Sequence, residues 1–246
     1  MAASLEILPV RVEGEIRPGD DLATTLLAAA PRLADGDIVV VAHKAVSKSE
    51  GRIVELSSVE PSPRARELAG HDRDARHVEV VLRESRRVLR ARAGLLIVET
   101  HHGLVCANAG VDRSNAPAPD SVVLLPADPD ASARALRAAL EAATGRSLAV
   151  IVADTIGRAW RVGILGTAIG ASGVRPLRVH AGKVDPNGYE LRTSSVAVAD
   201  ELAAAADLVL GKTERVPAAI VRGYGAAGEP GSASELIRDP ASDLFR

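Results

Sequence analysis

The segment VADTIGRAWRVGILGTAIG, residues 152–170, gathers several residue types that could do chemistry. Asp154 and Thr155 follow the apolar run LAVIVA, so a carboxylate and a hydroxyl come where a buried strand is expected to end and a loop to open. Such hard oxygen donors suit Mg²⁺ or Mn²⁺, which shares its remaining ligand positions with phosphate oxygens and water. The alternative is that Asp154 only caps the turn that follows it.

A second acid has a similar setting. Asp112 lies in NAGVDRSN, residues 108–115, after the apolar run GLLIVE, and Asn108 and Asn115 stand on either side of it. Two acids that each follow a strand could hold one or two divalent cations. Because such cations neutralise phosphate charge during transfer, the pair of acids indicates phosphate chemistry.

Basic residues for the remaining phosphate charge stand in two places. Lys44, Lys48 and Arg52 occur in HKAVSKSEGR, after the first strong strand pattern. Arg158 and Arg161 would add two cations on one face if their segment is helical. The alternative for Lys44 and Arg52 is an ordinary solvated face. Acids, loop lysines and glycine-rich turns together indicate nucleotide chemistry without a standard phosphate-binding loop.

Other candidate sites are weaker. GYGAAG, residues 223–228, matches a dinucleotide fingerprint as a string, but Pro230 follows where a helix should begin. His101 and His102 have no third residue at metal-ligand spacing, so we expect surface or hydrogen-bonded histidines. Cys106 has no charged neighbour that would lower the pKa of its thiol, and we expect a buried small hydrophobe.

The composition favours a globular protein that acts on small molecules. Of 246 residues, 47% are hydrophobic and 2% aromatic, and the formal net charge is −2. Lysine and arginine form no basic stripe, which argues against nucleic acid and membrane surfaces as partners. One cysteine excludes an internal disulfide. With no leader pattern and no apolar run of about 20 residues, a cytoplasmic location is expected.

The elements that must position these residues follow from hydrophobic periodicity. Strands are predicted by apolar, β-branched runs over residues 37–42, 94–99, 121–126, 148–153, 176–181, 207–211 and 218–223. Helices are predicted over residues 20–34, 62–73, 79–92, 128–145 and 196–206. Because the two kinds of element alternate imperfectly, we predict a mixed α/β (α+β) fold with mixed sheets rather than a simple parallel sheet.

The motifs together resemble one family. ILPV, RPGDDL, VSKSEGR, NAGVDRSN, DTIGRAW and VAVADELAAAADLVLGK occur in the order found in the coenzyme F420-0:L-glutamate ligases, also called F420 gamma-glutamyl ligases. The resemblance runs from residue 7 to about residue 223 and is strongest to the ligase half of the actinobacterial bifunctional ligase/nitroreductase. Residues 1–225 are then expected to form the ligase domain, which could divide into two subdomains, and residues 226–246 a tail with a short helix.

The resemblance implies a reaction and its partners. GTP would transfer its γ-phosphoryl group to a carboxylate of coenzyme F420-0, and the amine of L-glutamate would attack the resulting acyl phosphate, so that GDP and phosphate are released. Further γ-linked glutamates could follow. The implied architecture is a two-part fold with mixed sheets that forms an intertwined homodimer, with the nucleotide in a cleft near the subunit boundary.

The resemblance also implies cofactors and site residues. The cofactors would be one or two Mg²⁺ or Mn²⁺ ions, together with K⁺. Asp112 and Asp154 would ligate the divalent metal, with Thr155 as a further ligand, and the two acids with Arg158 would form the catalytic group. Trp160 would line the cleft, although it could equally fill core space. Contacts to GTP are implied for Gly14, Glu15, Ile16, His43, Lys48 and Asn115.

The chain departs from the family pattern at several places. Near the start, VEGEIRPGDD is two residues shorter than the corresponding turn of the family, and His43 replaces a small polar residue. Residues 164–166, Ile-Leu-Gly, stand where many relatives have polar residues, and Lys212 stands where archaeal members have a glutamine that contacts metal. A protonated lysine cannot coordinate metal, so one metal would be lost or held by water. Two alternatives therefore stay open: a nucleotide-dependent ligase that acts on a different acid, and a nucleotide-binding paralogue without turnover.

Overall fold

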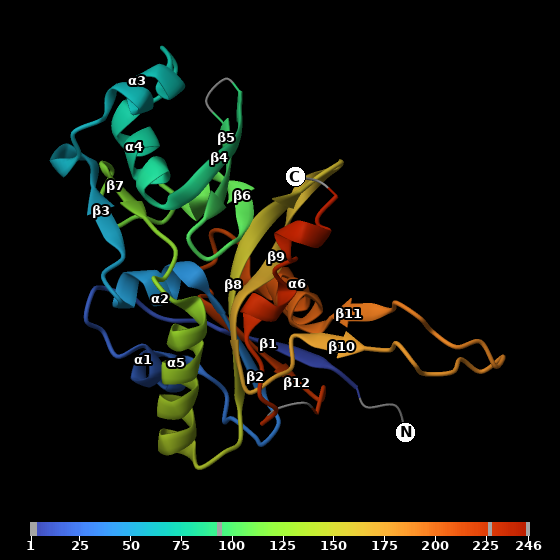
Figure 1. The fold of residues 1–246 in the computed structure, drawn as a ribbon. Helices are drawn as coiled ribbons and strands as arrows, with labels where there is room; N and C mark the ends of the chain where they lie inside the picture. The colour runs from blue at the N-terminus through green and yellow to red at the C-terminus, as the bar shows by residue number, and fades with distance from the viewer. Residues whose placement is uncertain (1–3, 93–94, 226–227, 245–246) are drawn as a thin grey trace.

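The structure, a computed structural model, describes residues 4–92, 95–225 and 228–244 (Figure 1). At its centre lies a five-stranded sheet in the order β1-β12-β2-β8-β9. β2 and β8 run parallel, whereas the other neighbouring strands pair antiparallel, so the predicted mixed α/β fold is confirmed. The strands are β1 (Glu6–Val10), β2 (Ile38–Ala42), β8 (Ala149–Arg158), β9 (Arg161–Ser172) and β12 (Ala218–Arg222).

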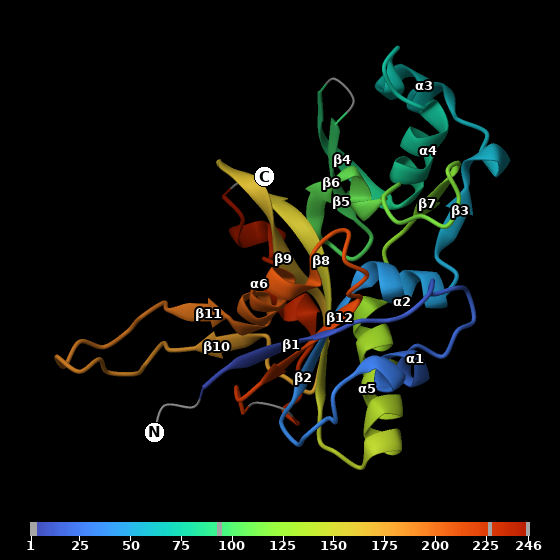
Figure 2. The same cartoon turned by 180° about the vertical axis from the view of Figure 1, so that it is seen from behind.

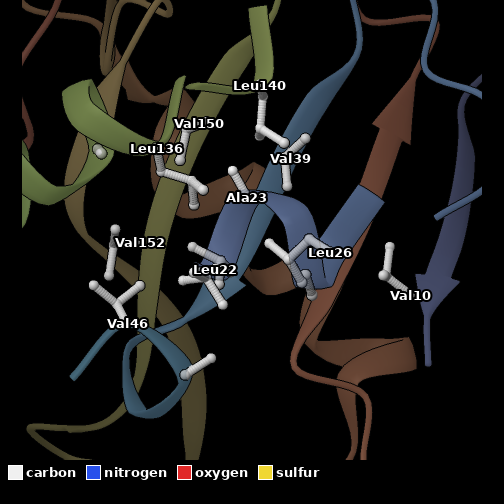
Figure 3. Close-up of a cluster of buried hydrophobic side chains, with 14 of the residues drawn as sticks. Val10, Leu22, Ala23, Leu26, Val39, Val46, Leu136, Leu140, Val150 and Val152 are labelled. Atoms are coloured by element: carbon white, nitrogen blue, oxygen red, sulfur yellow. The ribbon is translucent and has the colours of Figure 1, made fainter. Parts of the chain in front are cut away.

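Helices cover both faces of this sheet (Figures 1 and 2). Along β8, Val150 and Val152 belong to the core shared with α1, α2 and α5, seen in close-up in Figure 3. Ile151 and Ala153 belong to the core shared with α6, because successive side chains of a strand point to opposite faces. The helices are α1 (Leu22–Ala29), α2 (His43–Ser49), α5 (Pro129–Thr144) and α6 (Val198–Leu210).

The segment between α2 and α5 forms a second part with a core of its own. It contains a two-stranded sheet, β3-β7, and a three-stranded sheet, β4-β5-β6. β6 contacts β8 of the central sheet, so the two parts meet beside the long β8–β9 hairpin (Figure 1). The elements are β3 (Ile53–Glu55), α3 (Pro63–Ala69), α4 (Ala75–Arg83), β4 (Ser85–Arg92), β5 (Leu95–Thr100), β6 (Val105–Ala107) and β7 (Ser121–Val123), with 3₁₀ helices at Leu56–Ser58 and Asn108–Gly110.

An arm and a tail complete the chain. The arm is the hairpin of β10 (Leu177–Val179) and β11 (Ser195–Ala197), and it extends away from the sheet (Figures 1 and 2). In the tail, 3₁₀ helices occupy Ala233–Leu236 and Pro240–Ser242, while residues 226, 227, 245 and 246 lie outside the described residues. Asp130 ties the tail to the body, because it accepts the backbone N–H groups of both Ala171 and Ala233. Among the helices that the structure describes, none is long and apolar enough to cross a membrane.

Two predicted elements are wrong. Residues 207–211, predicted as a strand, form the last turn of α6 and its end, because Leu202, Ala206 and Leu210 continue a buried stripe with helical spacing. Residues 79–92, predicted as one helix, contain the end of α4 and then β4, which pairs with β5. In both cases pairing and packing with distant elements decide the local structure.

Candidate active site

A cavity of about 240 Å³ opens at the carboxyl end of the parallel pair β2–β8. Ligands of helix-covered sheets usually bind at this end of the strands. The cavity walls come from the segment after β1, the first turns of α2, the middle of β8, and the end of α6 with the loop behind it. The predicted nucleotide and metal residues that line it are Gly14, Glu15, Ile16, His43, Lys48, Asn115, Asp154 and Thr155.

The neighbouring Asp154 and Thr155 point to opposite faces of the sheet. β8 does not end before Asp154, as the sequence predicted, but continues to Arg158. Its alternation therefore continues as well, and Asp154 faces α2 whereas Thr155 faces α6. Asp154 Oδ1 lies 3.4 Å from His43 Nε2, and Thr155 Oγ1 accepts a hydrogen bond of 2.6 Å from Lys212 Nζ. The acid and the hydroxyl thus serve two different walls of the cavity.

His43 is a buried imidazole at the start of α2. Its side chain is 3% exposed, and burial lowers the pKa of His43 although the charge of Asp154 opposes this shift. Ser47 Oγ lies 3.5 Å from Nδ1, which leaves Nε2 to face the carboxylate of Asp154. A neutral imidazole in this place positions Asp154 without cancelling its charge.

Asp112 lies on the other side of the same helix turn. Lys44 Nζ lies 2.6 Å from Asp112 Oδ2 and donates a 2.6 Å hydrogen bond to Ser114 Oγ. Burial would raise the pKa of Asp112, but the hydrogen bonds from Lys44 and from the Ser114 backbone N–H outweigh it and hold the pKa below its usual value. Consecutive residues of α2, His43 and Lys44, therefore contact the two predicted metal-binding acids, Asp154 and Asp112.

Lys48 completes this wall, one turn further along α2. It is 8% exposed, and its ammonium group contacts the carboxylate of Glu15. Glu15 follows Gly14, whose φ of 85° lies in the left-handed region that glycine readily adopts. That turn brings the segment after β1 over the cavity. Lys48 thus carries a buried positive charge that is matched by a half-exposed acid on a loop.

The opposite wall was missed in the sequence, because part of it was taken for a strand. It consists of the end of α6 and the loop that follows, and it contributes Asp207, Lys212 and Arg215 to the cavity. Gly166 of β9 allows α6 to approach, because a Cβ atom there would lie 2.5 Å from the backbone oxygen of Ala203. A carboxylate and two basic side chains are thereby held against the middle of the β8–β9 hairpin.

Some of the predicted residues do not line the cavity; they are Arg52, Asp112, Arg158, Trp160 and Arg161. Arg158 and Arg161 do not share a helix face but pair with each other across the tip of the β8–β9 hairpin, and both are exposed. Trp160 lies between them, is 83% exposed and has a φ of 58°. The prediction that Trp160 fills core space is therefore wrong, and Trp160 does not line the cavity of this chain. Arg52 is not simply solvated, because it donates hydrogen bonds to Glu84 and to the backbone oxygen of Leu125.

The donors present fit a cation that binds together with a ligand. Within the described residues, no group of three or more His, Cys, Asp or Glu side chains is placed to hold a metal ion. Mg²⁺ commonly takes only one or two carboxylates and completes its shell with substrate phosphate and water. Asp154 and Asp112 could provide such carboxylates. Thr155 is the weakest candidate ligand, because the ammonium of Lys212 already occupies its hydroxyl oxygen.

The remaining candidates outside the cavity have ordinary structural roles. His101 Nε2 lies 2.9 Å from the backbone oxygen of Arg83, and His102 Nε2 lies 2.9 Å from that of Pro126. Cys106 is 6% exposed, and burial raises the pKa of its thiol to about 12. Hydrogen-bonded histidines and a buried cysteine were predicted, and both predictions are confirmed.

Comparison with known proteins gives one consistent picture. The family model of the F420-0:Gamma-glutamyl ligases matches residues 12–223. The chain is 47% identical to the coenzyme F420:L-glutamate ligase of Methanopyrus kandleri, in an alignment covering 99% of this chain and 98% of the relative. It is 44% identical to the protein of the same name from Methanothermobacter thermautotrophicus, covering 96% of this chain and 98% of that one. It is 42% identical to the protein of the same name from Archaeoglobus fulgidus, in an alignment covering 98% of this chain and 96% of the relative.

Proposed function

Because this chain belongs to the F420-0:gamma-glutamyl ligase family, we propose that it is a ligase that joins L-glutamate to coenzyme F420-0 in an amide bond. The observation that carries the proposal is the similarity, over nearly the whole chain, to relatives named coenzyme F420:L-glutamate ligase. A cavity with acids and bases on facing walls supports it, because the reaction must bring together several charged molecules.

We further propose that GTP drives the reaction through an acyl phosphate. A carboxylate does not react with an amine until its oxygen has become a good leaving group, and transfer of the γ-phosphoryl group achieves this. Lys48, Lys212 and Arg215 bring positive charge to the cavity, where they can bind and orient a triphosphate. No side-chain nucleophile is required, which agrees with a cavity wall built from lysines, arginine and carboxylates.

The proposed cofactor is Mg²⁺ or Mn²⁺. Asp154 would hold the ion, with Asp112 as a second carboxylate, and the bound ion would supply positive charge to the phosphate oxygens during transfer. His43 and Lys44 keep the two carboxylates in position from consecutive places on α2. A further contribution of K⁺ is proposed from the family resemblance alone.

A coupled assay of GDP release with purified coenzyme F420-0 tests the function. We expect GDP to form and glutamate to be consumed only when GTP, divalent metal and F420-0 are all present. Replacement of GTP by ATP, and of K⁺ by Na⁺, measures the two finer preferences. If GDP appears with another acid of a panel but not with F420-0, the substrate is wrong. GTP binding without turnover under any condition would instead identify a paralogue that has lost catalysis.

We also propose that the protein acts as a homodimer. The arm supports this proposal, because Val179, Val184 and Tyr189 are mostly exposed on it. Apolar side chains on an extended hairpin are typical of an interface. Light scattering after size exclusion should give twice the chain mass, and Tyr189→Lys combined with Val184→Lys should shift the protein towards the monomer. A monomeric parent protein at micromolar concentration would contradict the proposal.

A further inference from the structure

Asp207 lines the cavity without a partner of its own. It is half-buried in the last turns of α6, and no described residue hydrogen-bonds to its carboxylate or pairs with it. The other cavity carboxylates differ, since Glu15 contacts Lys48 and Asp154 faces His43. A partly desolvated carboxylate without a partner is costly, and a cavity is where a ligand can provide that partner.

The position of Asp207 places it beside the reacting groups. A Cβ atom on Gly166 would lie 3.0 Å from Asp207 Cβ, so the side chain of Asp207 begins directly above Gly166. Gly166 pairs across the hairpin with Thr155, the neighbour of Asp154. Lys212 Nζ donates to Thr155 and forms no ion pair with Asp207. The carboxylate is therefore one strand away from the proposed metal and phosphate residues, and free to bind something else.

The charges of the reactants select what Asp207 can bind. This step rests on the function proposed above. The triphosphate, the acceptor carboxylate and both carboxylates of glutamate are anions, whereas the amino group of glutamate is a cation at neutral pH. Lys48, Lys212 and Arg215 suit the anions, and a second anion beside Asp207 would be repelled. We propose that Asp207 binds the α-ammonium group of the incoming amino acid and so selects a substrate that carries one.

The direction of α6 favours the same ligand. The helix ends at Leu210, so Asp207 lies in the last turn, where the carbonyl end of the helix dipole adds negative potential. An acid could instead accept the N–H groups of a guanine base. The base, however, lies at the far end of a triphosphate from the transferred phosphoryl group, whereas the amine must reach the activated carboxyl carbon. Closeness to Thr155, whose hydroxyl accepts a hydrogen bond from Lys212, therefore favours the amine.

Asp207→Asn tests the assignment, because it keeps the size of the side chain and removes its charge. We expect KM for glutamate to rise about 10- to 100-fold, as for loss of a charged hydrogen bond. Formation of the acyl phosphate should be unchanged. It is measured without glutamate by trapping with hydroxylamine, whose uncharged nitrogen attacks the acyl carbon while phosphate leaves, giving a hydroxamate.

Glutarate, which is glutamate without the amino group, provides a sharper measurement as an inhibitor competitive with glutamate. In the parent protein its Ki should exceed KM for glutamate about 10- to 100-fold. In Asp207→Asn that ratio should fall to about 1 to 3, since only the amino group distinguishes the two molecules. Asp207→Ser gives the same comparison if the asparagine variant does not fold. Asp207→Glu keeps the charge and should retain most of the discrimination.

Asp200→Asn is the matched control. Asp200 stands two turns earlier on α6 and accepts the backbone N–H of Ala168, a hydrogen bond that an asparagine oxygen can also accept. Asp200 does not line the cavity, so Asp200→Asn should have the same ratio of Ki for glutarate to KM for glutamate as the parent protein. An unchanged ratio in Asp207→Asn would overturn the assignment, and so would a rise in KM confined to GTP, which would point to the base. If the parent protein itself forms no hydroxamate with F420-0 and GTP, it is the proposed function that fails.

Discussion

The two walls of the cavity differ in how their charges are matched. On the α2 wall, each basic or imidazole side chain already faces an acid; the pairs are His43–Asp154, Lys44–Asp112 and Lys48–Glu15. On the α6 wall, Lys212 donates to the hydroxyl of Thr155, and among the described residues neither Asp207 nor Arg215 has a charged partner. Both walls line the same cavity. The difference in charge pairing therefore comes from which residues each wall carries.

The difference in charge pairing suits the two walls to two tasks, which are positioning the protein's own groups and binding the ligand. Charges that are matched before any ligand binds hold the protein's own groups in place, and a ligand must displace one partner to use the other. Charges without partners cost desolvation in the free protein, and a ligand that supplies the opposite charge recovers this cost. Variants of the α2 wall should therefore alter the geometry of the site as well as binding, whereas variants of the α6 wall should alter binding alone.

Asp154→Ala should have the largest effect. It removes the proposed cation ligand and leaves His43 Nε2 without its acid, while the strand around it remains paired. Loss of several kcal/mol of charge stabilisation predicts a fall in turnover of about 10³-fold. GDP release measures the effect, and circular dichroism should show an intact fold. Asp72→Ala, at an exposed position of the second part, is the control. Undiminished turnover in Asp154→Ala would remove the metal assignment.

Lys212→Met should act on ligand binding alone. The side chain is exposed in the free protein and donates to Thr155 only, so its loss should leave the melting temperature unchanged. A lost charged hydrogen bond to phosphate predicts a rise in KM for GTP of about 10- to 100-fold. Lys183→Met, on the arm, makes the same change away from the cavity. If Lys212→Met lowers the melting temperature but not the affinity for GTP, the two walls do not divide as described.

Glu15→Gln should strengthen nucleotide binding, whereas most substitutions in a binding site weaken it. Glu15 competes with an incoming phosphate for Lys48, so removal of its charge should leave the buried ammonium free for the nucleotide. We expect the Kd of a non-hydrolysable GTP analogue to fall about 3-fold, a modest change because the acid is half exposed. Lys48→Met, the matched partner, should raise the same Kd. Calorimetry gives both values, and weaker binding in Glu15→Gln would show that Glu15 itself contacts the ligand.

The α2 wall could be predicted from the sequence far better than the α6 wall. Asp154 follows an apolar run with a clear strand pattern, so its place on a buried strand follows from periodicity, although β8 continues past it. Lys48 was predicted on a loop, and that prediction is wrong, because residues 43–49 form α2. Asp207 and Lys212 lie in or beside the run DLVLG, residues 207–211. A run of five residues is too short to distinguish a strand from the end of a helix. Only the buried stripe that begins at Val198 shows that the helix continues.

The β8–β9 hairpin was missed for a different reason. Its turn places Trp160 at a φ of 58°, a conformation in which tryptophan is uncommon, so no Asn-Gly or Gly-rich turn signal marks the tip. Without that signal, GRAWRVG suited a helix with Arg158 and Arg161 on one face. The long antiparallel pairing of β8 with β9 is a non-local interaction, and it overrides that local preference.

His43→Gln should give the smallest effect, and it concerns stability. Burial lowers the pKa of His43 below its ordinary value of 6.5, so just below pH 6.5 the unfolded chain binds a proton that the folded protein does not. The stability due to a neutral His43 is present above pH 6.5 and is lost as the pH falls through the lower folded pKa. The melting temperature of the parent protein should then fall more steeply below pH 6.5 than that of His43→Gln, where each 1 kcal/mol corresponds to about 2–4 °C. Burial also lowers the pKa of His77, so His77→Gln should remove a separate part of the slope. Parallel curves for the parent and His43→Gln would mean that folding does not shift the pKa of His43.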